Sequence, residues 1–155
     1  MDESEHGVPA VRRAGAADAA ALMAVDALAA AGDEGRRASP ARWCGGNAVV
    51  LLAEDPTGPL GFAVLEYTFF EQGFLTLLTV TAAARRRGVG RRLLAAVEAE
   101  CATPKLFTST NFSNHPMQRL LRSAGWEAAG LLHGLDEGDP ELFFRLARHA
   151  RHVLH

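Results

Sequence analysis

Arg85-Arg86-Arg87-Gly88-Val89-Gly90 is the stretch that decides the fold of this 155-residue chain. It follows an apolar run from Phe74 to Val80 that is rich in strand-forming residues. It precedes a segment, Arg91 to Cys101, in which apolar residues recur at helical spacing. The sequence therefore predicts a strand, a glycine turn and a helix in direct succession.

This unit has the properties of an anion-binding site. The first N–H groups of a helix have no partner within the helix, and they carry the positive end of its dipole. Gly88 and Gly90 have no side chain to keep a ligand from the backbone, and three consecutive arginines add positive charge. The unit is expected to bind phosphate. The alternative is a helix start with a solvated basic patch.

Length and composition are those of one globular domain. Apolar residues make up 48% of the chain and charged residues 22%, which excludes a disordered or fibrous protein. The net charge of −2 argues against a general nucleic-acid-binding protein. No apolar run approaches the roughly 20 residues that span a bilayer, and the first residues are acidic, unlike a signal peptide. We expect a soluble, cytoplasmic protein without a nucleic-acid or membrane partner.

Cysteine and histidine do not form a metal-binding pattern. Cys44 and Cys101 lie far apart without CxxC spacing, which favours neither a zinc site nor a disulfide. His149, His152 and His155 are three residues apart, but they fall in a tail that we expect to be frayed and solvated. No metal is therefore expected.

The predicted order of elements describes an α/β domain with a mixed sheet and helices on both faces. Strands are expected at 8–12, 48–54, 60–70, 74–80, 105–110, 126–135 and 141–146, and helices at 16–31, 40–43, 91–101 and 114–124. Only the strand from 105 needs a parallel crossover, because a helix connects it to the strand before it. The domain is expected to span 8–148, between a flexible leader at 1–7 and a tail at 149–155.

Two motifs resemble the GNAT superfamily of acetyl-CoA-dependent N-acetyltransferases. Arg85, Gly88 and Gly90 match the family's pyrophosphate loop, which has Gln or Arg, then Gly three residues later, then Gly or Ala two residues after that. Asn114 stands eleven residues before Gly125-Trp126, where the family has an asparagine before a Gly-Phe pair. The resemblance covers nearly the whole chain. It implies a mostly antiparallel, twisted sheet with a V-shaped splay between two central parallel strands.

The resemblance also implies where acetyl-CoA, as co-substrate, is bound. Backbone amides of the loop would hold the pyrophosphate, and the edge of the preceding strand would bind the pantetheine arm as an added strand would. The backbone N–H of Val80 would polarise the acetyl carbonyl. Asn114 would either bind the cofactor or only cap its helix. The implied cofactor-binding residues are Leu78, Thr79, Val80, Arg85, Arg86, Arg87, Gly88, Val89, Gly90, Arg91 and Asn114.

The acceptor amine and its base are less defined by the sequence. A free amine has a pKa near ~10, so direct attack on the thioester requires a base or a water chain. Glu66, near the end of one strand, is the favoured candidate, and Glu71, in the next turn, is the other. A register slip of one residue would reverse which face either occupies. The acidic turn with Asp136, Glu137, Asp139 and Glu141 is a further candidate for attracting a cation, or else a polar hairpin tip.

The general acid departs from the family pattern. Many members have a tyrosine four residues before the helix-ending glycine, and Leu121 occupies that position here. Tyr67, the one tyrosine of the chain, is a candidate acid only if the fold brings it to the site. Water can otherwise protonate the CoA thiolate. A covalent route is disfavoured, because Cys101 is expected to pack on the long helix and Cys44 has no neighbouring base in the sequence.

The expected function is therefore N-acetyl transfer to a primary amine of a small molecule or peptide, in a ternary complex. A catalytically weak acyl-CoA-binding or sensing module is the alternative, because Leu121 cannot donate a proton. A domain that binds nucleotide phosphate or RNA with the same arginines is the third. Exposed edge strands also make a homodimer plausible.

Overall fold

The computed structural model describes residues 8–26 and 34–147, with the backbone alone for residues 34–39. The predicted leader at 1–7, the tail with its three histidines and the end of the first predicted helix lie outside the described residues.

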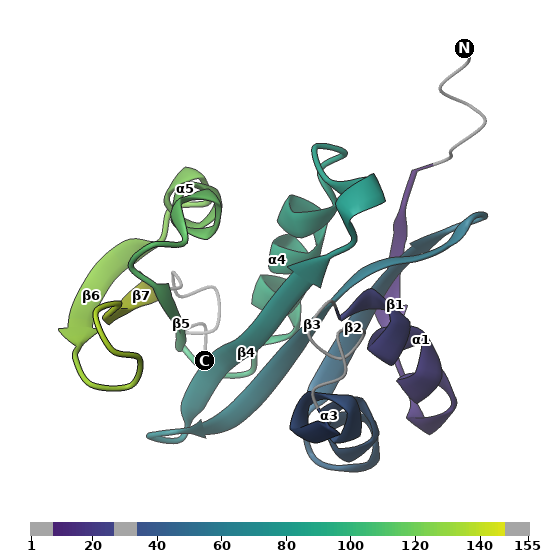
Figure 1. Cartoon of the computed structure of the whole chain (residues 1–155), viewed down its shortest axis with the longest axis horizontal. Coiled ribbons are helices and arrows are strands. Elements are labelled where there is room, and N and C mark those ends of the chain that lie inside the picture. Colours follow the sequence, from purple (N-terminus) through teal and green to yellow (C-terminus); the bar gives the residue numbers. More distant parts are fainter. Residues whose placement is uncertain (1–7, 27–33, 148–155) are drawn as a thin grey trace, which may run out of the picture.

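Seven strands form one mixed sheet in the order β1-β2-β3-β4-β5-β7-β6 (Figure 1). Each neighbouring pair is antiparallel except β4 and β5, which run parallel and are connected by a helix. The predicted α/β fold with one parallel crossover is therefore confirmed. The strands are β1 (Ala10–Arg13), β2 (Val49–Asp55), β3 (Gly58–Phe69), β4 (Gln72–Val80), β5 (Lys105–Asn111), β6 (Glu127–Leu132) and β7 (Glu141–Ala147).

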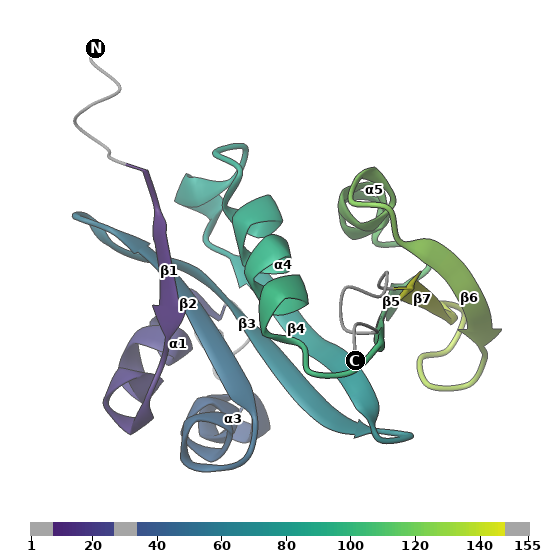
Figure 2. The same cartoon turned by 180° about the vertical axis from the view of Figure 1, so that it is seen from behind.

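Helices cover both faces of this sheet, as predicted (Figures 1 and 2). On one face α4 (Val89–Glu100) packs on β2, β3 and β4. On the other face α1 (Ala19–Val25) packs on β3 and α3 (Glu34–Gly45) on β2. A further helix, α5 (His115–Ser123), follows β5. No helix within residues 8–26 and 34–147 combines the length and apolar character that crossing a bilayer requires.

Strand alternation divides the buried residues into two cores. Leu51 and Ala53 of β2 point to the α4 face, where they join Leu93, Leu94 and the rest of the larger core. The residues between and before them, Val50 and Leu52, point to the α1 and α3 face. The continuous apolar run in β2 therefore reflects a strand that is buried on both faces.

The first two helices differ from their predicted bounds. The helix expected at 16–31 begins as a short 3-10 helix, η2 (Ala16–Asp18), and α1 ends at Val25, because Asp26 is extended with ψ 110°. An alanine-rich stretch carries little packing information, so its sequence does not mark this end. The helix expected at 40–43 is longer, and it contains Pro40 in its interior. Packing of Trp43 on Phe62, with ring centroids 6.2 Å apart, helps to hold this helix despite the proline.

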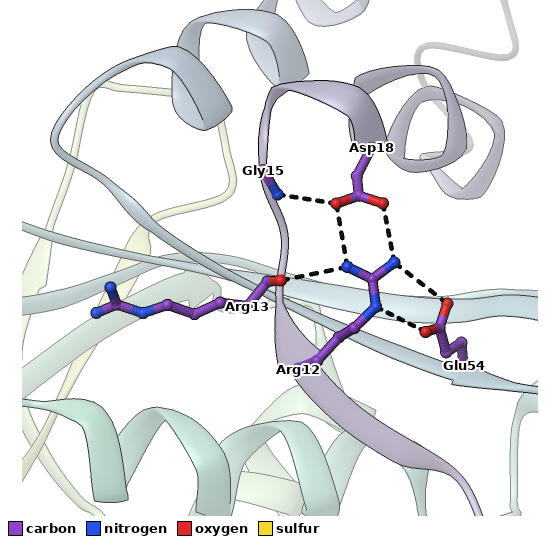
Figure 3. Close-up of polar contacts among 5 residues, drawn as sticks. All are labelled: Arg12, Arg13, Gly15, Asp18 and Glu54. Atoms are coloured by element: carbon purple, nitrogen blue, oxygen red, sulfur yellow. Dashed lines mark hydrogen bonds and ion pairs between the residues drawn. The ribbon is translucent and has the colours of Figure 1, made fainter.

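Arg12 joins β1, η2 and β2 through one guanidinium (Figure 3). Its Nη1 and Nη2 donate to the two carboxylate oxygens of Asp18 at 3.1 and 2.9 Å, and its Nε donates to Glu54 at 2.7 Å. The Gly15 N–H also donates to Asp18, at 2.8 Å. The hydrogen bonds from Arg12 and then from Gly15 lower the pKa of Asp18 to about 2. The network fixes where the chain leaves β1 and enters the first helices.

The lowered pKa of Asp18 predicts a pH-dependent contribution to stability. A depressed carboxyl pKa stabilises the fold above the ordinary value of 3.8, and this contribution is lost as the pH falls through about 2. Asp18→Asn should therefore lower the free energy of unfolding most above pH 4. The difference in free energy of unfolding between this variant and the wild type should be smaller at pH 3 than at neutral pH. Urea unfolding at these two pH values measures it. An equal difference at the two pH values would contradict the prediction.

Candidate functional site

The loop between β4 and α4 has the predicted strand, turn and helix arrangement. A short 3-10 helix, η3 (Ala82–Ala84), separates β4 from the turn, and Gly88 caps α4 with φ 78°. Arg86 is also left-handed, with φ 66°. Alternation of this kind turns successive N–H groups to one side and makes a concave site for anions. A Cβ at Gly88 would meet no atom of the described residues within 4 Å, so the backbone conformation rather than crowding requires glycine.

The arginine side chains of this loop have different partners. Arg87 Nη2 donates to Asp55 Oδ2 at 2.9 Å, in the turn between β2 and β3. Asp55 has a side chain with 0% exposure, and hydrogen bonds from Thr57 and then Arg87 lower its pKa to about 2. Arg91 donates to Ser123 of α5 at 2.8 Å. Arg87 and Arg91 therefore brace the loop against its neighbours, whereas the side chains of Arg85 and Arg86 are exposed.

An open groove of about 400 Å³ lies beside this loop. It brings together residues that are distant in the sequence but were predicted to bind one ligand, namely Leu78, Thr79, Val80, Arg85, Gly90 and Asn114. Sequence reasoning missed Pro116, Met117 and Leu120, which complete its wall. The helical spacing of Met117 and Leu120 after Asn114 is the signal that could have found two of them.

The edge of β4 presents backbone groups to the groove. Thr81 N–H donates to Leu60 O at 2.8 Å, which fixes the hydrogen-bonding phase between β3 and β4. Since that phase alternates along antiparallel strands, Leu77 and Thr79 bond to β3, whereas Leu78 and Val80 direct N–H and C=O groups the other way. Within the described strands, β5 pairs with β4 only at Gly73 to Leu75, so it does not reach this part of the edge.

A bulge in β4 coincides with the point where β4 and β5 separate. Val64 pairs with Leu77 and Leu65 with Leu75, so Thr76 is an extra residue in β4. A bulge bends its strand and increases the local twist. The last parallel pair is Leu75 with Thr108, and the Thr108 hydroxyl donates to the Leu75 carbonyl at 2.7 Å. We call this point, defined by Leu75 and Thr108, the vertex. Figure 1 shows that β4 and β5 diverge from one another.

The two candidate bases lie at different distances from the groove. Glu66 Oε1 accepts a hydrogen bond of 2.6 Å from Thr76, so its carboxylate lies beside the vertex. Glu71 is exposed in the turn before β4, seven residues from Leu78. At about 3.3 Å per strand residue, this separation is roughly 23 Å. The structure thus brings Glu66, but not Glu71, close to the groove.

Tyr67 and Leu121 do not present a proton donor to the groove. The Tyr67 hydroxyl accepts the Ala102 N–H at 3.0 Å, beyond the C-terminal end of α4, whereas the groove adjoins the N-terminal end of that helix. The side chain of Leu121 is 0% exposed and packs in the α4-side core. An acid role for Tyr67 therefore has no support from its position.

Asn114 both caps α5 and lines the groove. Its Oδ1 accepts the Met117 N–H at 3.2 Å, as the capping interpretation predicted. At the other end of α5, Gly125 has φ 90°, and the Trp126 and Gly125 N–H groups close the helix by bonding to Leu121 and Arg122. The asparagine and the Gly-Trp pair thus mark the two ends of the helix that forms the outer groove wall.

The acidic turn between β6 and β7 is tied to β5 and the start of α5. Asn111 donates to Asp136 at 2.8 Å, and the Ser113 N–H donates to Asp139 at 3.0 Å. Ser109 donates to Glu141 at 2.7 Å. Two of these carboxylates, Asp136 and Asp139, therefore position the turn, and Glu141 lies on the strand next to β5.

Comparison with known proteins agrees with this geometry. Residues 22–126 match the model of the acetyltransferase (GNAT) family. The chain belongs to the GNAT acetyltransferase family. No curated protein matches it.

Solved GNAT structures share the fold over almost the whole chain. A GNAT acetyltransferase of Bacillus cereus ATCC 10987 is 29% identical, with a TM-score of 0.84, covering 92% of this chain and 99% of its own. The ribosomal-protein-alanine N-acetyltransferase of Brucella melitensis is 25% identical, with a TM-score of 0.74, covering 89% of this chain and 99% of its own. The Salmonella typhimurium protein yncA, solved with its cofactor acetyl-CoA, is 21% identical, with a TM-score of 0.73, covering 93% and 97%.

Proposed function

We propose that this GNAT protein transfers the acetyl group of acetyl-CoA to a primary amine by direct attack in a ternary complex. The observation that carries the proposal is the groove. The groove joins the start of α4, at Gly90 and beside Arg85, with the β4 edge at Leu78 to Val80, and the vertex lies three residues before Leu78 along β4. Phosphate, amide and thioester groups occur in that order along acetyl-CoA.

The donor is proposed to bind with its pyrophosphate on the backbone amides of residues 86–91, near Arg85. Its pantetheine arm would bond to the β4 edge at Leu78 and Val80. A Cβ at Gly90 would lie 3.9 Å from Val80 Cγ2, so Val80 is next to the loop. Leu78 is two residues nearer the vertex. Val80 N–H remains the predicted donor to the acetyl carbonyl, and Leu78 N–H is a second one, better placed for the far end of the arm.

The acceptor amine is proposed to attack from the face of the sheet opposite α4. Its nitrogen forms a bond to the carbonyl carbon, the C–S bond breaks, and CoA leaves as a thiolate. Glu66, beside Thr76, takes the amine proton directly or through one water. Because Leu121 has no donor, water protonates the thiolate.

Assembly and location are further parts of the proposal. All six residues of β6 are exposed at one edge of the sheet, which is consistent with a homodimer through that edge. A cytoplasmic location stays a prediction from the sequence.

Acetyl-CoA binding and thiol release test the proposed activity. Calorimetry should show acetyl-CoA binding, and a thiol reagent should detect CoA release that depends on an added amine. Binding without release on any amine of a broad panel would favour the acyl-CoA-sensing module. Binding of RNA at physiological salt, with none of acetyl-CoA, would contradict the donor assignment.

Gly88→Val should weaken acetyl-CoA binding by about tenfold or more, because the backbone amides leave the conformation that faces the phosphate. Gly138→Val is a matched control, since Gly138 has φ 74° against 78° for Gly88. Both variants should lose roughly 1–2 kcal/mol of stability or more from strain. Equal affinity of the two folded variants would place the pyrophosphate elsewhere.

Glu66→Gln should lower kcat by about 10²-fold while leaving the acetyl-CoA dissociation constant unchanged, because an amide cannot accept the amine proton. The remaining activity should rise more steeply with pH than that of the wild type, since only amine that is already deprotonated reacts. Glu71→Gln, at the far end of β4, is the control and should retain wild-type kcat. A wild-type pH profile in Glu66→Gln would remove Glu66 from the mechanism.

A further inference from the structure

We propose that the acceptor is a small primary amine attached to an aromatic or similarly compact apolar group, without a carboxylate beside the amine. This inference rests on the proposed function and adds the substrate class. It depends on two features of the sheet face opposite α4. One is a cluster of phenylalanines on one side of the vertex, and the other is a pair of carboxylates that flank the vertex.

The phenylalanine cluster consists of Phe69, Phe74, Phe107 and Phe143. Phe74 and Phe107 are cross-strand partners in the last parallel pairs of β4 and β5. The ring of Phe69 lies 4.9 Å from Phe74, 5.3 Å from Phe107 and 5.9 Å from Phe143, measured between centroids. All four rings are half-buried, so they offer apolar surface to a ligand.

Strand alternation assigns this cluster to the acceptor face. Leu75 and Leu106 belong to the core under α4, so their neighbours Phe74 and Phe107 point to the opposite face. That is the face from which the amine is proposed to attack. An acceptor lying on these rings would therefore be on the correct side of the sheet.

An open apolar depression of about 320 Å³ adjoins the cluster. Phe69, Phe107 and Phe143 form one wall, and residues 129–132 of β6 form the other. This volume is at the lower end of the range for small-molecule sites, about 300–1,000 Å³. The depression therefore has room for a compact apolar group.

The two carboxylates are held in the same way on both sides of the vertex. Thr76 and Ser109 are the first residues of β4 and β5 beyond the last parallel pair. The Thr76 hydroxyl donates to Glu66 at 2.6 Å, and the Ser109 hydroxyl donates to Glu141 at 2.7 Å. Ser109 follows Phe107 by two residues and so shares its face. The opening of the strands is thus flanked by two negative charges next to an apolar floor.

Charge and shape together select the substrate class. An ammonium group is attracted to the vertex by Glu66 and Glu141, and its apolar body extends over the phenylalanines. An α-amino acid would place its own carboxylate close to both glutamates, and like charges in contact disfavour binding. A small polar amine would gain nothing from the rings. The acceptor that fits both features is a primary amine that carries an aryl group or a similarly compact apolar group.

Three acceptors measured with the wild-type protein and acetyl-CoA test this class: 2-phenylethylamine, ethylamine and L-phenylalanine. We expect kcat/KM for 2-phenylethylamine to exceed that for ethylamine by about tenfold or more, because the ring enters an apolar pocket. The kcat/KM for L-phenylalanine should be at least about tenfold lower than that for 2-phenylethylamine. Transfer to amines without this order overturns the substrate class and leaves the proposed function intact. Absence of acetyl-CoA binding, or of any transfer, overturns both.

Variants of the cluster separate a specificity role from a structural one. Phe143→Ala and Phe107→Ala should lower kcat/KM for 2-phenylethylamine toward the value for ethylamine, with little change for ethylamine itself or in acetyl-CoA affinity. Phe143→Leu, which keeps most of the apolar volume, should recover part of the loss. Equal losses for both amines would overturn the inference.

Glu141→Gln should raise KM for 2-phenylethylamine more than kcat changes, because it removes one charge that attracts the ammonium group. Glu127→Gln is the matched control, since Glu127 is an exposed glutamate on β6 with a side-chain exposure of 76%. The same KM in both variants would remove Glu141 from acceptor binding.

Discussion

The extra residue in β4 is the constraint on which the site depends. Thr76 shifts the register against β3 by one residue exactly where pairing with β5 stops. A strand that continued regularly would keep its hydrogen bonds to β5, and its edge would be closed to any ligand. The Thr108 hydroxyl bonds to the last β4 carbonyl of the paired segment, so the strands separate there without leaving that buried acceptor unpaired. The same divergence leaves the part of β4 from Leu78 to Val80 unpaired with β5, and this is the part that lines the groove.

The loop that follows also contains local backbone strain. Arg86 and Gly88 both have positive φ, and a non-glycine residue in this region is costly. The ion pair between Arg87 and the fully buried Asp55 carboxylate lies between these two positions and ties the loop to the β2–β3 turn. One arginine of the run thus stabilises the conformation, while its neighbour Arg85 lines the groove. The arginines of this loop therefore have different positions: Arg87 supports the loop through Asp55, whereas Arg85 is at the groove.

The sequence was sufficient for features that are encoded locally. The order of elements, the parallel crossover, the glycine turn before α4 and the stop of α5 at Gly125 all follow from nearby residues, and the structure confirms them. The sequence was insufficient where tertiary packing determines the bounds of an element or the partner of a side chain. The end of α1 at Val25 lies in an alanine-rich stretch without a stop signal, and α3 persists through Pro40. Asp55 was visible only as a turn residue, because its partner Arg87 is 32 positions away.

The proposed donor and acceptor sites differ in this respect for a physical reason. Phosphate and pantetheine would be recognised by backbone groups of one loop and one strand edge, so a short motif predicts them. The proposed acceptor face is built from side chains of β3, β4, β5 and β7, and which of them meet depends on strand order and register. Phe69 and Phe143 come together because β7 pairs with β5 rather than with β6 alone. A register shift of one residue in any of these strands would replace the aromatic floor with different side chains, so members of one fold family can share a donor and differ in acceptor.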